Sequence, residues 1–279
     1  MDPARRQNLT LRIASALVLF PLAVWFTFEG GLPFALLAAV AASIAASELV
    51  LMFAGPGGAG VLEVFGIVVA GLVPLGAAFG SAGDLLPGWS GLALAGATVV
   101  VLTLALFRQG PLEAIPARIA VVAFSWLYCG LLLASVVGLR LRFGGGWVIL
   151  AFVVTWGNDT FAYFAGHAFG RHKMSPRISP KKTWEGFAGG AVGSVVGALV
   201  TRALLPSDLG GLDLAHAVLL GAGGAVLGPL GDLAESLLKR AAGVKDSGKV
   251  IPGHGGLLDR IDALLFVSPW IYVCAAYLR

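Results

Sequence analysis

Charged residues are scarce in this chain of 279 residues: they make up 12% of it, while hydrophobic residues make up 58%. A water-soluble domain carries about 25% charged residues. Half that density cannot cover a surface exposed to water, so a soluble globular protein is excluded and lipid must be the solvent for most of the chain. Short segments of alternating polarity, typical of a membrane-spanning barrel, are also missing. The sequence therefore predicts an all-α, polytopic membrane protein.

Cysteine is nearly absent as well. The chain has two, Cys129 and Cys274, and both lie in apolar segments. Neither belongs to a CxxC pair or to another cluster with metal-ligand spacing. A cysteine-based metal site is thereby excluded, and we interpret both residues as packing residues.

Long apolar segments follow one another from the N-terminus to the C-terminus. We expect about nine transmembrane helices, at residues 11–28, 32–53, 61–79, 89–107, 118–138, 146–168, 184–205, 214–238 and 260–277. Most of the 19 Lys and Arg residues fall in connections on one side of this arrangement, whereas Arg140 and Arg142 fall on the other. The positive-inside rule then predicts the N-terminus in the cytoplasm and the C-terminus outside.

The second half of the chain is shorter than the first and carries more of the charge. We therefore expect transmembrane scaffold helices at residues 1–145. A catalytic transmembrane region with cytoplasmic polar loops is expected at residues 146–279.

Several carboxylates fall inside or at the ends of the expected helices. A charge at the centre of a membrane helix costs roughly 2.5–3.5 kcal/mol, so retained charges indicate a polar cavity with a function. Spacings of three place Asp232 with Glu235, and Asp259 with Asp262, on common helix faces, and Ser236 joins the face of Asp232. Paired oxygen ligands suit Mg²⁺ or another hard cation. The alternative is that each carboxylate pairs with a nearby Lys or Arg at a helix end. The full candidate set is Glu48, Asp159, Asp232, Glu235, Asp259 and Asp262.

A basic, glycine-rich segment separates the two carboxylate pairs. Its glycines permit positive φ angles and would leave backbone N–H groups for an anion nest. Its cations suit phosphate oxygens, and His254 could be a phosphate donor, a proton-transfer group or a loop residue without a role. A metal, several cations and a glycine-rich loop together are what a triphosphate requires. The cations are Lys239, Arg240, Lys245 and Lys249.

Residues 236–262 resemble the signature of the phosphatidate cytidylyltransferases, also called CDP-diacylglycerol synthases. The resemblance rests on the polar and glycine positions of this segment: Ser236, Lys239, Arg240, Lys245, Asp246, Gly248, Pro252, Gly253, His254, Gly255, Gly256, Asp259, Arg260 and Asp262. A second stretch is similar to the other polar segment of the family: Asn158, Asp159, Tyr163, Gly170, Arg171 and the run from Ile178 to Gly186.

The resemblance implies an enzyme of phospholipid biosynthesis that transfers a cytidylyl group from CTP to phosphatidic acid, giving CDP-diacylglycerol and pyrophosphate. It implies Mg²⁺ bound by Asp232, Asp259 and Asp262, with K⁺ suggested as a second cation. The other catalytic candidates are Lys239, Arg240, Lys245, Arg260 and His254. The substrate-binding candidates are Asn158, Asp159, Ser179, Lys181, Lys182, Ser236, Asp246, Lys249, Gly255 and Gly256.

The substrates also define the expected surroundings. Diacyl chains stay in the lipid bilayer while CTP arrives from water, so we expect the active site at the cytoplasmic face of a bacterial cytoplasmic membrane. No nucleic-acid partner is expected. The sequence does not decide whether the protein forms a homodimer.

Three other functions fit parts of the pattern. An ion- or proton-coupled transporter also uses intramembrane carboxylates, but it predicts them near the bilayer midplane in broken helices. A CTP-dependent lipid kinase is related in chemistry, although the long motif at 236–262 argues against it. A CDP-alcohol phosphotransferase would need a DGxxAR pattern, which this sequence lacks.

Overall fold

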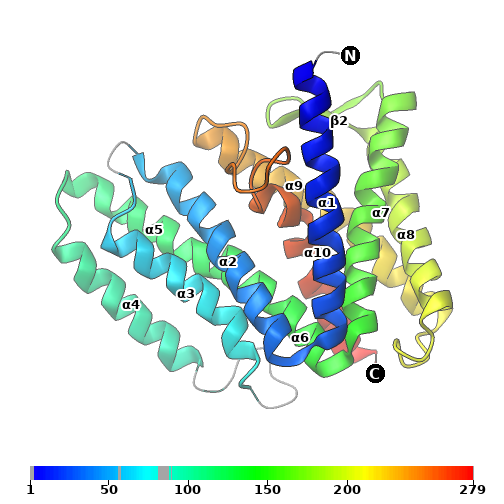
Figure 1. The fold of residues 1–279 in the computed structure, drawn as a ribbon, viewed down its shortest axis with the longest axis horizontal. Helices are drawn as coiled ribbons and strands as arrows, with labels where there is room; N and C mark the ends of the chain where they lie inside the picture. The colour runs from blue at the N-terminus through cyan, green and yellow to red at the C-terminus, as the bar shows by residue number, and fades with distance from the viewer. Residues whose placement is uncertain (1–2, 56–57, 81–87, 89, 279) are drawn as a thin grey trace. The chain divides into compact units, whose positions relative to one another are not determined.

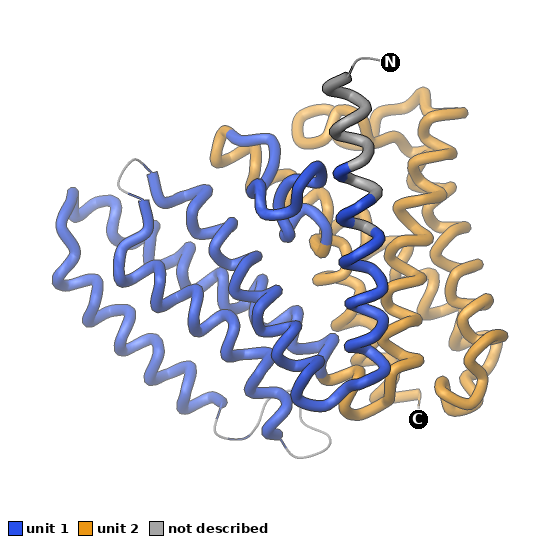
Figure 2. The backbone as a smooth tube through the Cα atoms, in the orientation of Figure 1, with its two compact units in different colours: residues 1–137, 244–260 blue, residues 138–243, 261–279 orange. Residues whose placement is uncertain are grey.

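The computed structural model describes residues 3–55, 58–80, 88 and 90–278, without the side chains of 3–10, 12, 13 and 16. The chain forms two compact units (Figure 2). Unit 1 comprises residues 1–137 and 244–260, and unit 2 comprises residues 138–243 and 261–279. The division expected from the charge distribution, after residue 145, lies close to the first of these boundaries. It does not anticipate that residues 244–260 join the first unit; the assignment of scaffold and catalytic roles stays a prediction.

Unit 1 consists of a group of helices and the polar segment 244–260 (Figure 1). Helix α2 packs against α1, α3 and α5, and α3 also packs against α4 and the π-helical turn η3. Its elements are α1 (Pro3–Glu29), α2 (Gly31–Phe53), α3 (Val61–Ala77), α4 (Ser90–Leu106), η2 (Leu112–Ala114), α5 (Ile115–Ser125), η3 (Trp126–Leu131) and the first half of α6 (Leu132–Phe143).

Unit 2 is built on α7, α8 and α9, which pack against one another. Thr183 begins α8 by accepting a hydrogen bond from the Gly186 amide, and Asp213 begins α9 by accepting one from the His216 amide. Its elements are the rest of α6, α7 (Gly145–Phe169), β1 (Lys173–Ser175), β2 (Ser179–Thr183), α8 (Trp184–Leu204), α9 (Leu214–Ala241) and most of α10 (Leu258–Tyr277).

Each of the nine expected membrane segments coincides with a helix or, for 118–138, with the continuous run Leu112–Phe143. Within the described residues, six helical runs are long and apolar enough to cross a membrane. Three further apolar helices are shorter: Leu17–Glu29, Val61–Ala77 and Ser90–Leu106. The all-α membrane fold is thus confirmed. The number of crossings and the orientation stay predictions, and the side chains of Arg5, Arg6 and Arg12, which contribute to the charge count, lie outside the described part.

The basic stretch Ser179–Thr183, one of the polar segments that the sequence predicts to be cytoplasmic loops, forms a strand of a short hairpin instead. Strands β1 and β2 pair antiparallel, with Lys173 opposite Thr183 and Ser175 opposite Ser179. The turn between β1 and β2 is short, so the backbone N–H and C=O groups of the two strands can hydrogen-bond to each other. In a loop at a membrane surface, these groups would bond to water instead.

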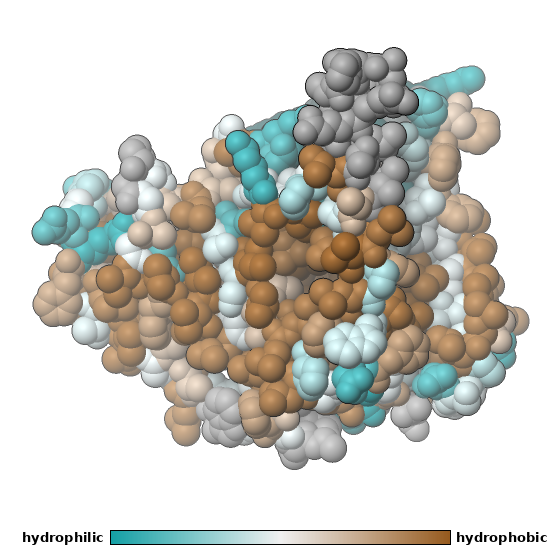
Figure 3. Space-filling view, viewed as in Figure 1, coloured by the Kyte–Doolittle hydropathy of each residue, from teal (hydrophilic) through white to brown (hydrophobic). Residues whose placement is uncertain are grey.

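Large apolar side chains face outward from the helices. On α2 and α3 they include Leu36, Val40, Val68 and Leu72, each about half exposed. Figure 3 shows hydrophobic side chains covering most of the visible faces of α2, α3 and α4, with hydrophilic ones gathered near the helix ends. Exposed apolar area of this extent indicates a lipid-facing surface.

Close packing of α7 against α8 depends on glycine. A Cβ added at Gly193 would lie 2.7 Å from the Phe161 Cβ, and one at Gly157 would lie 2.9 Å from the Gly193 carbonyl oxygen. The two backbones can therefore approach only because both positions lack a side chain.

We expect Gly193→Ala to lower the Tm of the detergent-solubilised protein, because the new methyl group forces α7 and α8 apart. Gly228→Ala in α9 is the matched control in the same unit, since its Cβ would find its nearest neighbour at 3.7 Å, an ordinary contact. The control should keep or slightly raise the Tm, since Ala favours helix by about 1 kcal/mol over Gly. Equal Tm values for the two variants would contradict the role of Gly193.

Candidate active site

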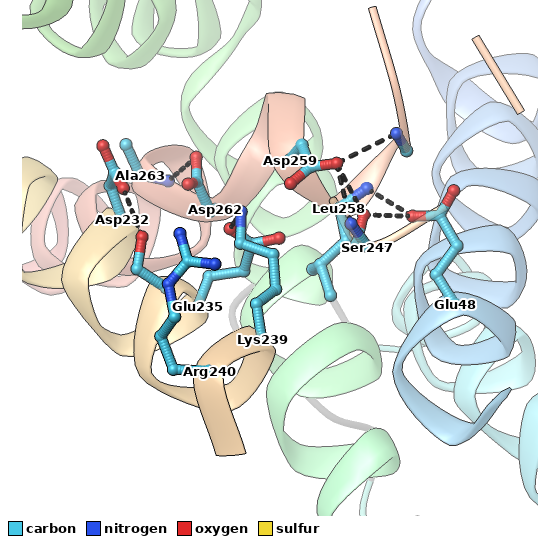
Figure 4. Close-up of polar contacts among 12 residues, drawn as sticks. Glu48, Asp232, Glu235, Lys239, Arg240, Ser247, Leu258, Asp259, Asp262 and Ala263 are labelled. Carbon is cyan, nitrogen blue, oxygen red and sulfur yellow. Dashed lines mark hydrogen bonds and ion pairs between the residues drawn. The ribbon is translucent and has the colours of Figure 1, made fainter. Parts of the chain in front are cut away.

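Four carboxylates gather in the helices of unit 2. Asp262 on α10 is buried and interacts electrostatically with Asp232 and Glu235 on α9 and with Asp159 on α7. Figure 4 shows Asp232, Glu235 and Asp262 among their polar contacts. Like charges held close together repel one another unless cations offset them. The arrangement is therefore one that attracts a cation.

Lysines meet two of these carboxylates. Lys182 Nζ lies 2.8 Å from Asp232 Oδ2 and donates to the Pro229 carbonyl oxygen at 3.2 Å. Lys239 forms an ion pair with Glu235, one turn away on α9, and the Glu235 side chain is fully buried. The helix-end pairing considered as an alternative for the acidic residues thus exists for both Asp232 and Glu235. Neither pairing tests the predicted catalytic role of Asp232.

An ion pair and a hydrogen bond join the β1–β2 hairpin to the C-terminal part of α9. Arg240 Nε donates to the Ile178 carbonyl oxygen at 3.4 Å, and Lys182 reaches Asp232 from β2. Ser236 Oγ donates to Asp232 Oδ1 at 3.2 Å. The two stretches that carry the family resemblance, around residues 180 and 236, therefore meet within unit 2.

The segment 244–260 of unit 1 is organised around Asp259. Its Oδ2 atom accepts hydrogen bonds from the Ser247 amide at 3.0 Å and the Gly256 amide at 2.9 Å, and the Ser247 hydroxyl oxygen lies 3.0 Å from it. Gly253 and Gly255 have φ of 76° and 90°, as the glycine pattern predicts.

Three amides of this segment already have partners within the chain, and the anion nest stays a prediction for the rest of the segment. The amides of His254 and Gly255 donate to the Ile251 carbonyl oxygen, and that of Gly256 donates to Asp259. Gly255 and Gly256 can therefore contribute shape, but not their amides as the segment stands.

His254 contacts the first helix. Its Nδ1 atom lies 2.8 Å from the Ser15 hydroxyl of α1. Ser15 also lies 3.3 Å from the Pro252 carbonyl oxygen. Ser15 could not be found from the sequence, because a lone serine in an apolar helix forms no recognisable pattern.

The remaining candidates divide by exposure. Asn158 is buried and donates from Nδ2 to Ser194 Oγ at 3.0 Å, so it bridges α7 and α8. Ser179 is half-buried in β2. Exposed side chains, able to meet a substrate from water, are those of Asp159, Lys181, Lys245, Asp246, Lys249 and Arg260. The roles assigned to all of these residues stay predictions.

Comparison with known proteins decides between the functional interpretations. The sequence profile of the cytidylyltransferase family matches residues 10–278. A phosphatidate cytidylyltransferase from Brucella abortus is 34% identical over 280 residues, covering 96% of this chain and 94% of that protein. Proteins of the same name from Thermotoga maritima and Bacillus subtilis are 41% identical over 157 residues and 45% identical over 137 residues, respectively. These matches cover 56% and 48% of this chain and 58% and 49% of the two relatives.

The chain belongs to the cytidylyltransferase family. The protein is therefore an enzyme, a nucleotidyltransferase. Membership of this family argues against the interpretation as a transporter.

A metal ion suits the donors that this cytidylyltransferase offers, although nothing in the comparisons names one. In the described part of the chain, no three Asp, Glu, His or Cys side chains converge closely enough to enclose a metal. Mg²⁺ does not need such a cage, since it is usually held by one or two carboxylates, waters and substrate phosphates. Asp232 and Asp262 supply that number of hard oxygen ligands within one unit.

We expect Lys239→Met to destabilise the enzyme by roughly 3–5 kcal/mol, because Glu235 would keep a buried charge without its ion-pair partner. The double variant Glu235→Gln, Lys239→Met should recover most of that loss, as measured by thermal unfolding in detergent. A double variant as unstable as the single one would contradict the pairing. Comparison with Glu235→Gln then tests Lys239 separately: an active Glu235→Gln beside a stable but inactive double variant supports the predicted catalytic role of Lys239.

Proposed function

We propose that this protein transfers a cytidylyl group from CTP to phosphatidic acid, giving CDP-diacylglycerol and pyrophosphate. The observation that carries the proposal is the match, over 96% of the chain, to a protein named phosphatidate cytidylyltransferase. The apolar helices fit a lipid substrate, and the acidic and basic side chains at their ends fit a nucleotide and a cation.

The reaction is a substitution at the α-phosphorus of CTP. A phosphate oxygen of phosphatidic acid forms a bond to that phosphorus, and the bond to the bridging oxygen of the β-phosphate breaks. Pyrophosphate leaves with the electron pair. The attacking phosphate is already an anion, so the protein needs no general base for it and contributes positioning and charge neutralisation.

Mg²⁺ is the proposed cofactor, with Asp232 and Asp262 as ligands and Asp259 as the third ligand that the sequence predicts. When bound, Mg²⁺ would offset the charge of the triphosphate. Lys182 would leave Asp232 for a phosphate oxygen, because a divalent cation competes for the same carboxylate. K⁺ as a second cation and a homodimer belong to the same set of predictions.

Exposed cations would receive the remaining phosphate charge. Among the described residues, none of four basic side chains forms an ion pair within its own unit: Lys181, Lys245, Lys249 and Arg260. Such cations are available to bind phosphate oxygens without first breaking a contact. We place the site at the cytoplasmic face of a bacterial inner membrane, where CTP is present and where the positive-inside rule puts these residues.

Radiolabelled CTP tests the proposal directly. Purified protein in phosphatidic acid micelles should move label from the α-phosphate or from cytidine into lipid, only when Mg²⁺ is present. Label from the γ-phosphate should appear in pyrophosphate. Lipid that gains γ-phosphate label would instead identify a lipid kinase and overturn the proposal.

Asp232→Asn should lower the rate of cytidylyl transfer by on the order of 10²-fold or more, because the variant loses a charge that faces the triphosphate and its cation. Asp213→Asn is the matched control, since Asp213 caps the opposite end of the same helix, where it accepts from the His216 amide. The control should retain activity. Comparable activity of Asp232→Asn and wild type would remove Asp232 from the site.

A further inference from the structure

Glu48 is a buried carboxylate without a role in the mechanism above. Glu48 lies in α2, one of the helices long enough to cross a membrane, and 4% of its surface is exposed. A buried ionised group persists only where several donors satisfy it, because desolvation is costly. The partners of Glu48 therefore indicate what it does.

All its described hydrogen bonds come from the polar segment 244–260 of the same unit. Glu48 Oε1 accepts from the Leu257 amide at 2.9 Å. Glu48 Oε2 accepts from the Leu258 amide at 2.8 Å and lies 3.0 Å from the Ser247 hydroxyl oxygen, whose single hydrogen is shared between Glu48 and Asp259. These amides stand at the start of α10, where N–H groups have no partner within the helix and favour a negative charge.

The backbone of the segment is shaped around this carboxylate. A Cβ at Gly248 would lie 2.5 Å from Glu48 Oε1, and one at Gly256 would lie 2.6 Å from Oε2. Only residues without a side chain let the chain approach so closely. Glu48, which lies outside the family-like motif, thus accounts for Gly248, and Glu48 together with Ser247 accounts for Gly256.

Ser247 links Glu48 to Asp259. Its hydroxyl lies 3.0 Å from Glu48 Oε2 and 3.0 Å from Asp259 Oδ2, while its amide donates to the same Asp259 atom. Figure 4 shows the side chains of Glu48 and Asp259 pointing toward Ser247 from two sides. The position of Asp259 is therefore coupled to that of Glu48 through a single residue.

We infer that Glu48 is a positioning residue that holds the segment 247–258 and, through Ser247, orients Asp259. The effect of Glu48 on catalysis rests on the proposed function, whereas its effect on the segment does not.

Limited trypsin digestion of Glu48→Gln, without CTP or metal, tests the positioning. Gln keeps the size of Glu, but its amide NH₂ must face a backbone N–H whichever way the group is turned. Loss of a charge-assisted bond should raise local opening and hence cleavage after the exposed Lys245 and Lys249 about tenfold. Cleavage after the exposed Lys181, in the other unit, is the internal reference and should not change.

Glu63→Gln is the matched control for burial of a carboxylate. Glu63 is 2% exposed, lies in the same unit and accepts from Gly60, Arg108 and Arg118 rather than from the segment. Faster cleavage at Lys245 and Lys249 in Glu48→Gln alone supports the inference. No increase, or the same increase in both variants, overturns it.

A second measurement separates positioning from general stability. With Asp259 loosened, the Mg²⁺ concentration for half-maximal cytidylyl transfer should rise roughly tenfold in Glu48→Gln, as for other residues that orient a metal ligand. Glu63→Gln should leave that concentration unchanged, and an unchanged value in Glu48→Gln contradicts the link to Asp259.

Ser247→Ala carries the same tests if Glu48→Gln fails to fold, because it removes only the hydroxyl that joins Glu48 to Asp259. It should raise both cleavage after Lys245 and Lys249 and the Mg²⁺ requirement, and wild-type values overturn the inference. Wild-type protein that transfers no label from CTP would contradict the proposed function and would leave the trypsin test intact.

Discussion

A carboxylate that leaves water must be met by donors, and this constraint governs the polar parts of the protein. Glu63 is held by two arginines and an amide, and Glu235 by Lys239. Glu48 is held instead by backbone amides and a hydroxyl, and no cation is among its described partners. In each case the helices can bury the acid only because the chain supplies these partners from another turn or segment.

The two kinds of partner have different consequences. A lysine or arginine neutralises the acid and leaves little charge for a ligand, which suits a structural pair such as Glu63 with Arg118. Amides satisfy the hydrogen bonds but keep the negative charge, and they tie the acid to the course of the backbone. Glu48 and Asp259 both bind backbone amides of the segment 247–258, so that segment is ordered by two anions that belong to the chain.

Besides donors for the buried carboxylates, the fold needs segments that approach one another closely, and glycine permits this. Gly157 and Gly193 bring α7 and α8 together, whereas Gly248 and Gly256 bring a loop onto a carboxylate. The same residue type thus serves packing in the membrane helices and polar contact at a helix end. For an enzyme proposed to act on a lipid and a nucleotide together, rigid helices and an ordered polar segment are complementary needs.

Sequence alone determined the helices and the chemical character of the site. Apolar length predicts each of the nine helical segments because a backbone in lipid must satisfy its own hydrogen bonds. Spacing of three placed Asp232 with Glu235 because helical geometry is local. The partners of these acids could not be predicted, since Ser247 meets Glu48 across 199 residues and Lys182 meets Asp232 from a hairpin. Only the tertiary structure decided that three successive amides of the segment, those of Gly256, Leu257 and Leu258, donate to Asp259 and Glu48. Contacts between distant segments depend on how whole helices pack, which no local pattern specifies.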